Sequence, residues 1–365
     1  MRDAQKYWGH NLELFCHLYD RCFGLLWQQM DDYRQTQYDI REHLIDRAPE
    51  FTGGRNRKRK KQERIAYLTA MMHVGGPYAN TRGLVSFLRG HKHDRKFFIY
   101  NYGTADQELV KSLKGFRYRS FEGSYEEKIA GIMRACEQDG IDVLISDMYW
   151  SVPLVLFKMR AAPWQYYFSM GFQKFPSDKV ILMDTMEPFD EDCHMVPYTV
   201  SREFLYRKET PIEKVADFGT LARLEKASPE FCETVKEIER GTEKRYRIWG
   251  NGTRPGIETS PPDSPHRVLP TLDVFLDPFP LCGCMASFEA QAHGVPVVTL
   301  SNPATKSYDR HKPLVVETRE EYVNQTVRLL ESAEYRKQVA EVGRQKVAKI
   351  TDCRKGAKAV EELWN

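Results

Sequence analysis

The sequence has no long apolar run and few cysteines. No stretch reaches the roughly 18 consecutive apolar residues that a membrane-spanning helix needs, and residues 1–6 lack the apolar segment of a secretion signal. Eight cysteines are too few to staple a chain of 365 residues, and Cys282 and Cys284 have no second pair with which to bind zinc. These features predict a cytoplasmic protein with reduced thiols, no membrane span and no bound metal.

The sequence also lacks an excess of charge of either sign. It contains 54 Lys and Arg against 51 Asp and Glu, a net charge of +3. Residues 55–64 alone hold seven basic residues and one acidic residue, so the basic charge is concentrated in one segment. We interpret this segment as a solvated linker; the alternative is a contact for phosphate, nucleic acid or anionic lipid.

From residue 64 onward, short apolar runs alternate with amphipathic stretches, which is typical of parallel strands joined by crossover helices. The alternation weakens over residues 185–212, where three prolines interrupt it, and then restarts. We therefore predict an α/β fold with two Rossmann-like, doubly wound domains. The predicted division is an N-terminal helical segment with the basic linker (1–60), a first domain (61–205) and a second domain (206–365).

Apolar residues at helical spacing in the first 50 residues predict helices that pack on another surface of the chain. The expected strands are residues 65–71, 96–100, 116–121, 141–147, 164–168, 215–218, 245–249, 272–276 and 295–300. The expected helices are residues 83–88, 107–113, 125–136, 152–159, 229–239, 285–292, 320–330 and 334–349, with a terminal helix that ends at residue 364.

The most specific pattern is a strand, a loop, a helix and a second strand around Gly283, a residue that allows a tight turn. The N–H groups of Cys284, Met285 and Ala286 would be free at the helix start, which favours binding of an anion such as a diphosphate. Glu289 lies one turn further on, where its carboxylate can accept hydrogen bonds from ribose hydroxyls. The alternative is an ordinary strand–helix–strand unit.

This stretch resembles the sugar-nucleotide segment of GT-B glycosyltransferases, especially the O-linked N-acetylglucosamine transferases and the bacterial cytoplasmic adhesin N-glycosyltransferases. The resemblance implies diphosphate contacts from the backbone of residues 284–286 and a ribose contact from Glu289. The family often has His-Thr-Thr where this chain has Cys-Met-Ala, so backbone contacts would replace hydroxyl contacts to the phosphate. The positions that fit the family pattern are Asp273, Leu276, Asp277, Pro280, Gly283, Glu289, Gly294, Pro296, Val298 and Thr299.

Two other stretches are similar to the same family. Residues 162–165, Ala-Pro-Trp-Gln, followed by Gly171, match an A-P-x-Q motif and the glycine after that strand. Residues 218–224 resemble the end of the first strand of the C-terminal domain, where family members place a lysine that neutralises the diphosphate. Arg223 stands there in this chain, and its guanidinium offers a planar fork instead of a point charge. The alternative for Arg223 is a surface charge.

The loop after the first predicted strand carries the candidates for proton transfer and sugar contact. His73 has a side chain whose ordinary pKa suits a general base, and the alternative is a histidine that only hydrogen-bonds the loop. Gly75 and Gly76 would allow close approach of the backbone to a bound sugar phosphate. The loop fits neither the G-x-G-x-x-G fingerprint nor the phosphate-loop lysine motif. Asp147, which ends a predicted strand, is a second candidate; the alternative is a helix cap.

Together with these residues, the resemblance implies an inverting glycosyltransferase with the GT-B fold that uses a nucleotide diphosphate sugar, expected to be a UDP-sugar, and no cofactor. No Asp-x-Asp motif stands at a strand end, so we expect no metal. A helix N-terminus and Arg223 would stabilise the leaving diphosphate.

The acceptor implied by the resemblance is a side chain of a protein or peptide, either a Ser or Thr hydroxyl or an Asn amide. The basic segment 55–64 leaves nucleic acid open as an acceptor, for instance a hydroxymethylated DNA base, and a glycan is a further alternative. Two other classes also remain open. One is a UDP-sugar epimerase on the same fold, and the other is a protein without turnover that binds a partner through residues 1–50.

Overall fold

The computed structural model describes two compact units. The first unit comprises Met1–Pro197 and Arg354–Asn365, and the second comprises Tyr198–Cys353. Residues 198–205 thus belong to the second unit and the C-terminal end to the first, whereas the sequence predicts a boundary after residue 205 and the last helix in the second domain. The described residues are 12–21, 63–73, 79–92, 94–148, 150–169, 175–185, 193–283, 285–301 and 306–364.

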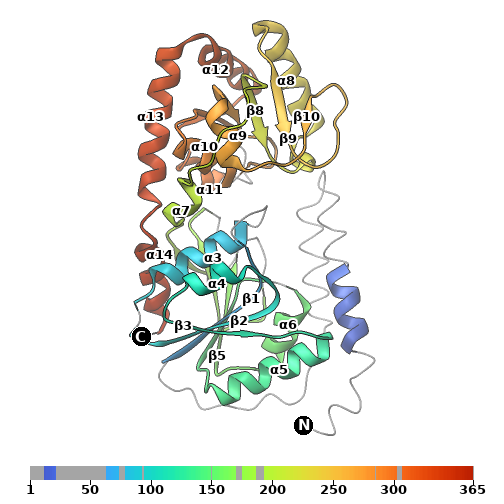
Figure 1. The fold of residues 1–365 in the computed structure, drawn as a ribbon, viewed down its shortest axis with the longest axis vertical. Coiled ribbons are helices and arrows are strands. Elements are labelled where there is room, and N and C mark those ends of the chain that lie inside the picture. Colours follow the sequence, from blue (N-terminus) through green and yellow to red (C-terminus); the bar gives the residue numbers. More distant parts are fainter. Residues whose placement is uncertain are drawn as a thin grey trace. The chain divides into compact units, whose positions relative to one another are not determined.

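The first unit contains a parallel sheet that has seven strands within the described residues, in the order β3-β2-β1-β4-β5-β6-β7. Helices α3 and α4 lie on one side of this sheet in Figure 1, and α5 and α6 lie on the other. The strand order reverses between β1 and β4, which is the position where doubly wound folds bind ligands. The elements are β1 (Arg64–Met72), α3 (Ala79–Gly90), β2 (Lys96–Ala105), α4 (Gln107–Ser112), β3 (Phe116–Ser120), α5 (Tyr125–Gln138), β4 (Val143–Ser146), α6 (Ser151–Lys158), β5 (Trp164–Ser169), β6 (Lys179–Met183) and β7 (Cys193–Val196).

Burial on both faces explains the central strands of this sheet. All four residues of β4 and most of β1 are buried, so both have continuous apolar runs. Helix α5 begins with a capping box in which Ser124 and Glu127 satisfy each other's backbone N–H groups. Strand β1 has an irregular register between Thr69 and Met71. Gly103 of β2 lies beside this irregularity, where a Cβ atom would collide with the carbonyl oxygen of Ala70.

A short N-terminal helix, residues 12–21, packs on the first unit. Leu12, Cys16 and Tyr19 are buried in the same core as residues of β1, β2, α5 and α6. The remainder of the predicted N-terminal segment and most of the basic run lie outside the described residues.

Partly buried polar contacts hold the C-terminal helix α14 (Cys353–Glu361) and the 3-10 turn η3 (Glu362–Trp364) to the first unit. Glu361 Oε1 lies 3.0 Å from Nδ1 of His91, whose Nε2 lies 2.5 Å from the Tyr67 hydroxyl. The carbonyl oxygen of Ala359 lies 2.9 Å from Nε2 of His194. These long-range contacts place the last helix with the first unit, and helical periodicity in the sequence carries no sign of them.

The second unit contains a parallel sheet that has six strands within the described part of the chain, in the order β10-β9-β8-β11-β12-β13. It repeats the strand order of the first unit, with the reversal between β8 and β11. The elements are α7 (Arg202–Leu205), β8 (Phe218–Leu221), η1 (Leu224–Lys226), α8 (Pro229–Thr242), β9 (Tyr246–Trp249), β10 (Thr259–Ser260), α9 (Pro265–Val268), η2 (Leu269–Thr271), β11 (Val274–Leu276), α10 (Met285–Ala292), β12 (Val297–Leu300), α11 (Lys306–Asp309), β13 (Leu314–Val316), α12 (Arg319–Glu331) and α13 (Ala333–Lys349).

The prediction of an α/β fold with two Rossmann-like domains is confirmed, with local differences. Strand β8 lies three residues later than the predicted strand 215–218. It contains Gly219, a weak strand former that is needed because a Cβ atom would crowd the carbonyl oxygen of Arg247 and the ring of Trp249. Four short strands escaped the sequence analysis, namely β6, β7, β10 and β13.

Candidate functional site

The loop between β11 and α10 is organised by the carboxylate of Asp277. Its Oδ1 atom accepts hydrogen bonds from the N–H of Gly283 and from the Ser287 hydroxyl, the latter at 3.0 Å. Its Oδ2 atom accepts from the Thr299 hydroxyl at 3.1 Å and from Nζ of Lys312 at 3.0 Å. Asp277 follows β11 directly, so this network lies at the carboxyl edge of the sheet, beside the reversal of strand order.

Gly283 is required here by close approach and not by an unusual backbone angle. The φ angle of Gly283 lies outside the left-handed region, so residues other than glycine could adopt this backbone conformation. The tight turn that the sequence analysis predicted is therefore not the reason for a glycine here. A Cβ atom at this position would lie 2.9 Å from Oδ1 of Asp277 and 3.3 Å from the Ser287 hydroxyl. The carboxylate can therefore bond the backbone of the loop only because residue 283 has no side chain.

The predicted donor-binding residues occupy the start of α10. The sulfur of Met285 accepts a hydrogen bond from the Tyr198 hydroxyl at 2.8 Å. The N–H of Ala286, expected to be free, donates to the carbonyl oxygen of Gly283 at 3.3 Å. The predicted ribose ligand Glu289 is only 1% exposed. Cys284 lies outside the described residues, and the first turn of α10 contains no acidic residue that would compete with an anion.

Two cationic residues follow β8, the strand beside β11. Arg223 is exposed and precedes η1, while Lys226 is half-buried. Nζ of Lys226 donates to the carbonyl oxygen of Cys282 at 2.7 Å, and the backbones of Ala227 and Pro280 form an antiparallel bridge. The structure thus places Lys226 beside the start of α10, a position that the sequence analysis assigned only to Arg223. The sequence did contain a sign of this role. Lys226 lies three residues before the start of α8, in the loop that follows β8, and that loop lies beside the reversal of strand order.

Three helix N-termini of the first unit, those of α4, α5 and α6, are already occupied by its own carboxylates. Asp106 accepts from two N–H groups of α4. Glu13 accepts from the N–H of Tyr125 at 3.4 Å at the start of α5. Asp20 accepts from the N–H of Ser151 at 2.9 Å at the start of α6. These helix starts are therefore poor sites for a diphosphate, in contrast to that of α10.

The candidates for proton transfer follow neighbouring strands of the first unit. His73 follows β1, and its Nε2 lies 2.7 Å from the Thr104 hydroxyl. Gly75 and Gly76 fall in residues 74–78, outside the described residues, so their predicted sugar contact stays a prediction.

Asp147 follows β4, the strand next to β1, and is 2% exposed. Burial raises the pKa of its carboxyl group to about 7. Thr69 donates to Oδ2 at 3.3 Å, whereas Oδ1 has no hydrogen-bond partner within the described residues. The alternative role as a cap of α6 is wrong, because Asp20 bonds the N–H of Ser151 at that helix start.

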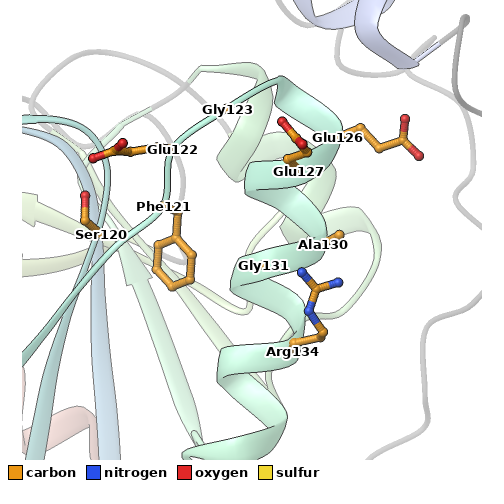
Figure 2. A pocket seen from close by; sticks show the side chains of 9 residues that line it. All are labelled: Ser120, Phe121, Glu122, Gly123, Glu126, Glu127, Ala130, Gly131 and Arg134. Atoms are coloured by element: carbon orange, nitrogen blue, oxygen red, sulfur yellow. The ribbon is translucent and has the colours of Figure 1, made fainter.

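A cavity of about 560 Å³ lies between the end of β3 and the start of α5 (Figure 2). Glu122, Glu126 and Glu127 line it together with Phe121 and Arg134. Three carboxylates against one guanidinium make this cavity unsuitable for a diphosphate.

Within the residues that the structure describes, no group of three or more His, Cys, Asp or Glu side chains could hold a metal ion. The helices in the same part of the chain are all too short or too polar to cross a membrane.

The comparisons with known proteins concern the fold. No protein-family model and no curated protein matches the sequence. The solved structure of a lysine-to-methionine mutant of Thermobaculum terrenum O-GlcNAc transferase is similar to this chain, with a TM-score of 0.70 and 19% identity, over 99% of this chain and 78% of that one.

Two further structures are similar over most of both chains. Anabaena HepE in complex with UDP has a TM-score of 0.60 and 10% identity, over 82% of this chain and 99% of that one. Sucrose-phosphate synthase from Thermosynechococcus elongatus has a TM-score of 0.59 and 11% identity, over 83% and 98%. The two parallel sheets and these likenesses show the GT-B fold, as the resemblance in the sequence implies.

Proposed function

We propose that this protein is a glycosyltransferase that takes a sugar from a nucleotide diphosphate sugar, and that its second unit binds this donor. The observation that carries the proposal is the position of the start of α10, beside the reversal of strand order in the second sheet. The carboxylate of Asp277 in this loop is buried, and both of its oxygen atoms accept hydrogen bonds from the protein itself. Such a helix start attracts a diphosphate through its N–H groups and its dipole.

The diphosphate would contact the N–H groups of Cys284 and Met285, with a weaker contribution from Ala286, whose N–H already has an acceptor. Lys226 and Arg223 would add positive charge from the loop after β8. Glu289 would accept hydrogen bonds from the ribose. The similarity to a structure that contains UDP supports a UDP-sugar as the donor.

The proposed reaction inverts the configuration at the anomeric carbon and proceeds without a metal ion. The acceptor loses a proton to His73, and its oxygen or nitrogen then forms a bond to the anomeric carbon. The bond between that carbon and the diphosphate oxygen breaks, and the electron pair stays with the diphosphate. The start of α10 and the two cations stabilise the negative charge that develops there, which is the electrostatic role that such groups serve in group transfer.

The acceptor that we propose is a protein or peptide side chain, as the resemblance to O-GlcNAc transferases implies. The basic segment 55–64 keeps nucleic acid as an alternative. Binding that weakens steeply with salt would favour DNA, because phosphate contacts release counterions.

The test is a panel of UDP-, GDP- and TDP-sugars, scored for release of the nucleotide with and without candidate peptides, glycans and DNA. Release from one donor that increases with one acceptor supports the proposal. Release without an acceptor, together with an altered sugar, would indicate an epimerase. Release from no donor would overturn the proposal.

A further inference from the structure

We propose that the buried ion pair of Asp277 and Lys312 positions the loop before α10 so that it can receive the diphosphate of the donor. The inference rests on the proposed function and assigns to Lys312 a role that the sequence analysis did not give it. Both side chains are fully buried, so neither touches the donor in this arrangement. We therefore describe them as positioning residues.

The carboxylate of Asp277 joins two parts of the second unit. Its Oδ1 atom bonds the proposed diphosphate site, through the backbone of Gly283 and the side chain of Ser287 in α10. Its Oδ2 atom bonds Thr299 of β12 and Lys312 before β13. This one carboxylate therefore ties the helix start to two strands of the sheet and to Lys312.

Lys312 supplies the positive charge that compensates the buried carboxylate of Asp277. Removing one partner of a buried pair leaves an uncompensated charge, which is strongly unfavourable. The carboxylate would then turn away from the loop toward water. The acceptor for the N–H of Gly283 would be lost, and with it the contact that holds the loop.

Close packing limits the other conformations that this loop could adopt. Oδ1 of Asp277 and the Ser287 hydroxyl fill the space beside Cα of Gly283. Nζ of Lys312 also lies 5.1 Å from the centre of the Phe288 ring, so the lysine contacts α10 as well as Asp277. Loss of the lysine would therefore change the place of the helix start and leave the outer surface of the unit unaltered.

The experiment compares the affinities of the full-length protein for UDP and for uridine, measured by calorimetry, in Lys312→Met and in the wild type. Uridine lacks the diphosphate, so its affinity reports whether the rest of the nucleoside pocket is intact. We expect UDP to bind about 10-fold or more weakly to Lys312→Met, while uridine binding changes by less than about twofold. The control is Lys214→Met, which removes a lysine that pairs with Asp273 at 2.8 Å at the other end of β11. This control should change neither affinity.

Two further variants make the result decisive. In the double variant Lys312→Met with Asp277→Asn, no charge is buried, and the Asn carbonyl can still accept from Gly283. We expect UDP affinity to recover to within about threefold of the wild type. If Lys312→Met does not fold, Ser287→Ala removes one of the two donors to Oδ1 and should weaken UDP alone by about threefold.

The outcomes separate this inference from the proposed function. An unchanged ratio of UDP to uridine affinity in Lys312→Met, or in Ser287→Ala where the former does not fold, overturns the inference and leaves the proposed function standing. An equal loss of both ligands also overturns it, because it shows a merely structural role. A wild type that binds uridine and UDP equally, or neither, overturns the proposed UDP-binding site and the inference with it.

Discussion

Nζ of Lys226 lies 2.7 Å from the carbonyl oxygen of Cys282, which joins the loop after β8 to the loop after β11. The backbone bridge between Ala227 and Pro280 joins the same two loops a second time. Because Gly283 follows Cys282 directly, this ammonium group lies next to the start of α10. A cation beside the proposed diphosphate site is thus held in place by the loop that forms the site.

Lys226→Met should lower kcat/KM for the nucleotide sugar by about 100-fold or more, because the positively charged ammonium group near the leaving diphosphate is lost. The measurement is nucleotide release at saturating acceptor. Lys236→Met is the control, since that lysine pairs with Glu233 on an exposed face of α8. If Arg223→Met lowers kcat/KM more than Lys226→Met does, Arg223 is the main cation at the diphosphate, as the sequence analysis predicts.

Glu289→Ala should weaken UDP binding by about 10-fold, because the carboxylate is proposed to hold the ribose. The matched ligand is 2′-deoxy-UDP, which lacks one of the two hydroxyl groups. Its affinity should fall less in the variant than the affinity for UDP does. An equal loss for both nucleotides would show that this buried residue supports packing and does not contact the ribose.

His73→Ala should leave UDP affinity unchanged and lower turnover by about 100-fold, the usual range for loss of a general base. Thr104→Val removes the hydroxyl that lies 2.7 Å from Nε2 of His73 and should lower turnover less. Steady-state kinetics gives kcat and KM separately for the two variants, and the effect should appear in kcat. Unchanged turnover in His73→Ala would show that the base is another residue.

Asp147→Asn should change how stability depends on pH. The pKa of this carboxyl group is about 7 in the folded protein, against 3.8 for an unperturbed aspartate, so the folded state keeps a proton that the unfolded state releases between these values. The contribution to stability is full below about pH 4 and falls as pH rises toward 7. The free energy of unfolding of Asp147→Asn should not fall in this way. At pH 8 the variant should be more stable than the wild type by roughly 3–4 kcal/mol.

Urea unfolding at pH 4 and pH 8 measures this difference. Asp263→Asn is the control, because Asp263 pairs with Arg267 at the surface. Parallel pH dependence in the wild type and in Asp147→Asn would show that the carboxyl group is solvated in the folded protein.

The sequence predicted the α/β class and most central elements because buried parallel strands and amphipathic helices carry strong periodic signals. Strands β10 and β13 carry only two and three residues, which gives little periodic signal. Strands β6 and β7 are as long as strands that were found, but they lie beside or within residues 185–212, where the alternation of apolar and amphipathic stretches weakens. Strand β8 was displaced in the prediction because Gly219 and Thr220 resemble loop residues, although both are buried in the sheet. The motif around Gly283 was found, but the reason for the glycine was not.

The order of apolar and polar residues by itself determined that two doubly wound sheets form. The motif around Gly283 and its resemblance to GT-B glycosyltransferases predicted residues 273–300 as the place where a ligand would bind. Only the tertiary structure decided which side chains meet there. Lys312 lies 35 residues after Asp277, and Lys226 lies 56 residues before Cys282. Contacts across such separations depend on how strands stack in the sheet, which local periodicity does not encode. For the same reason, the return of the last helix to the first unit, through His91 and Glu361, could be seen only in the folded chain.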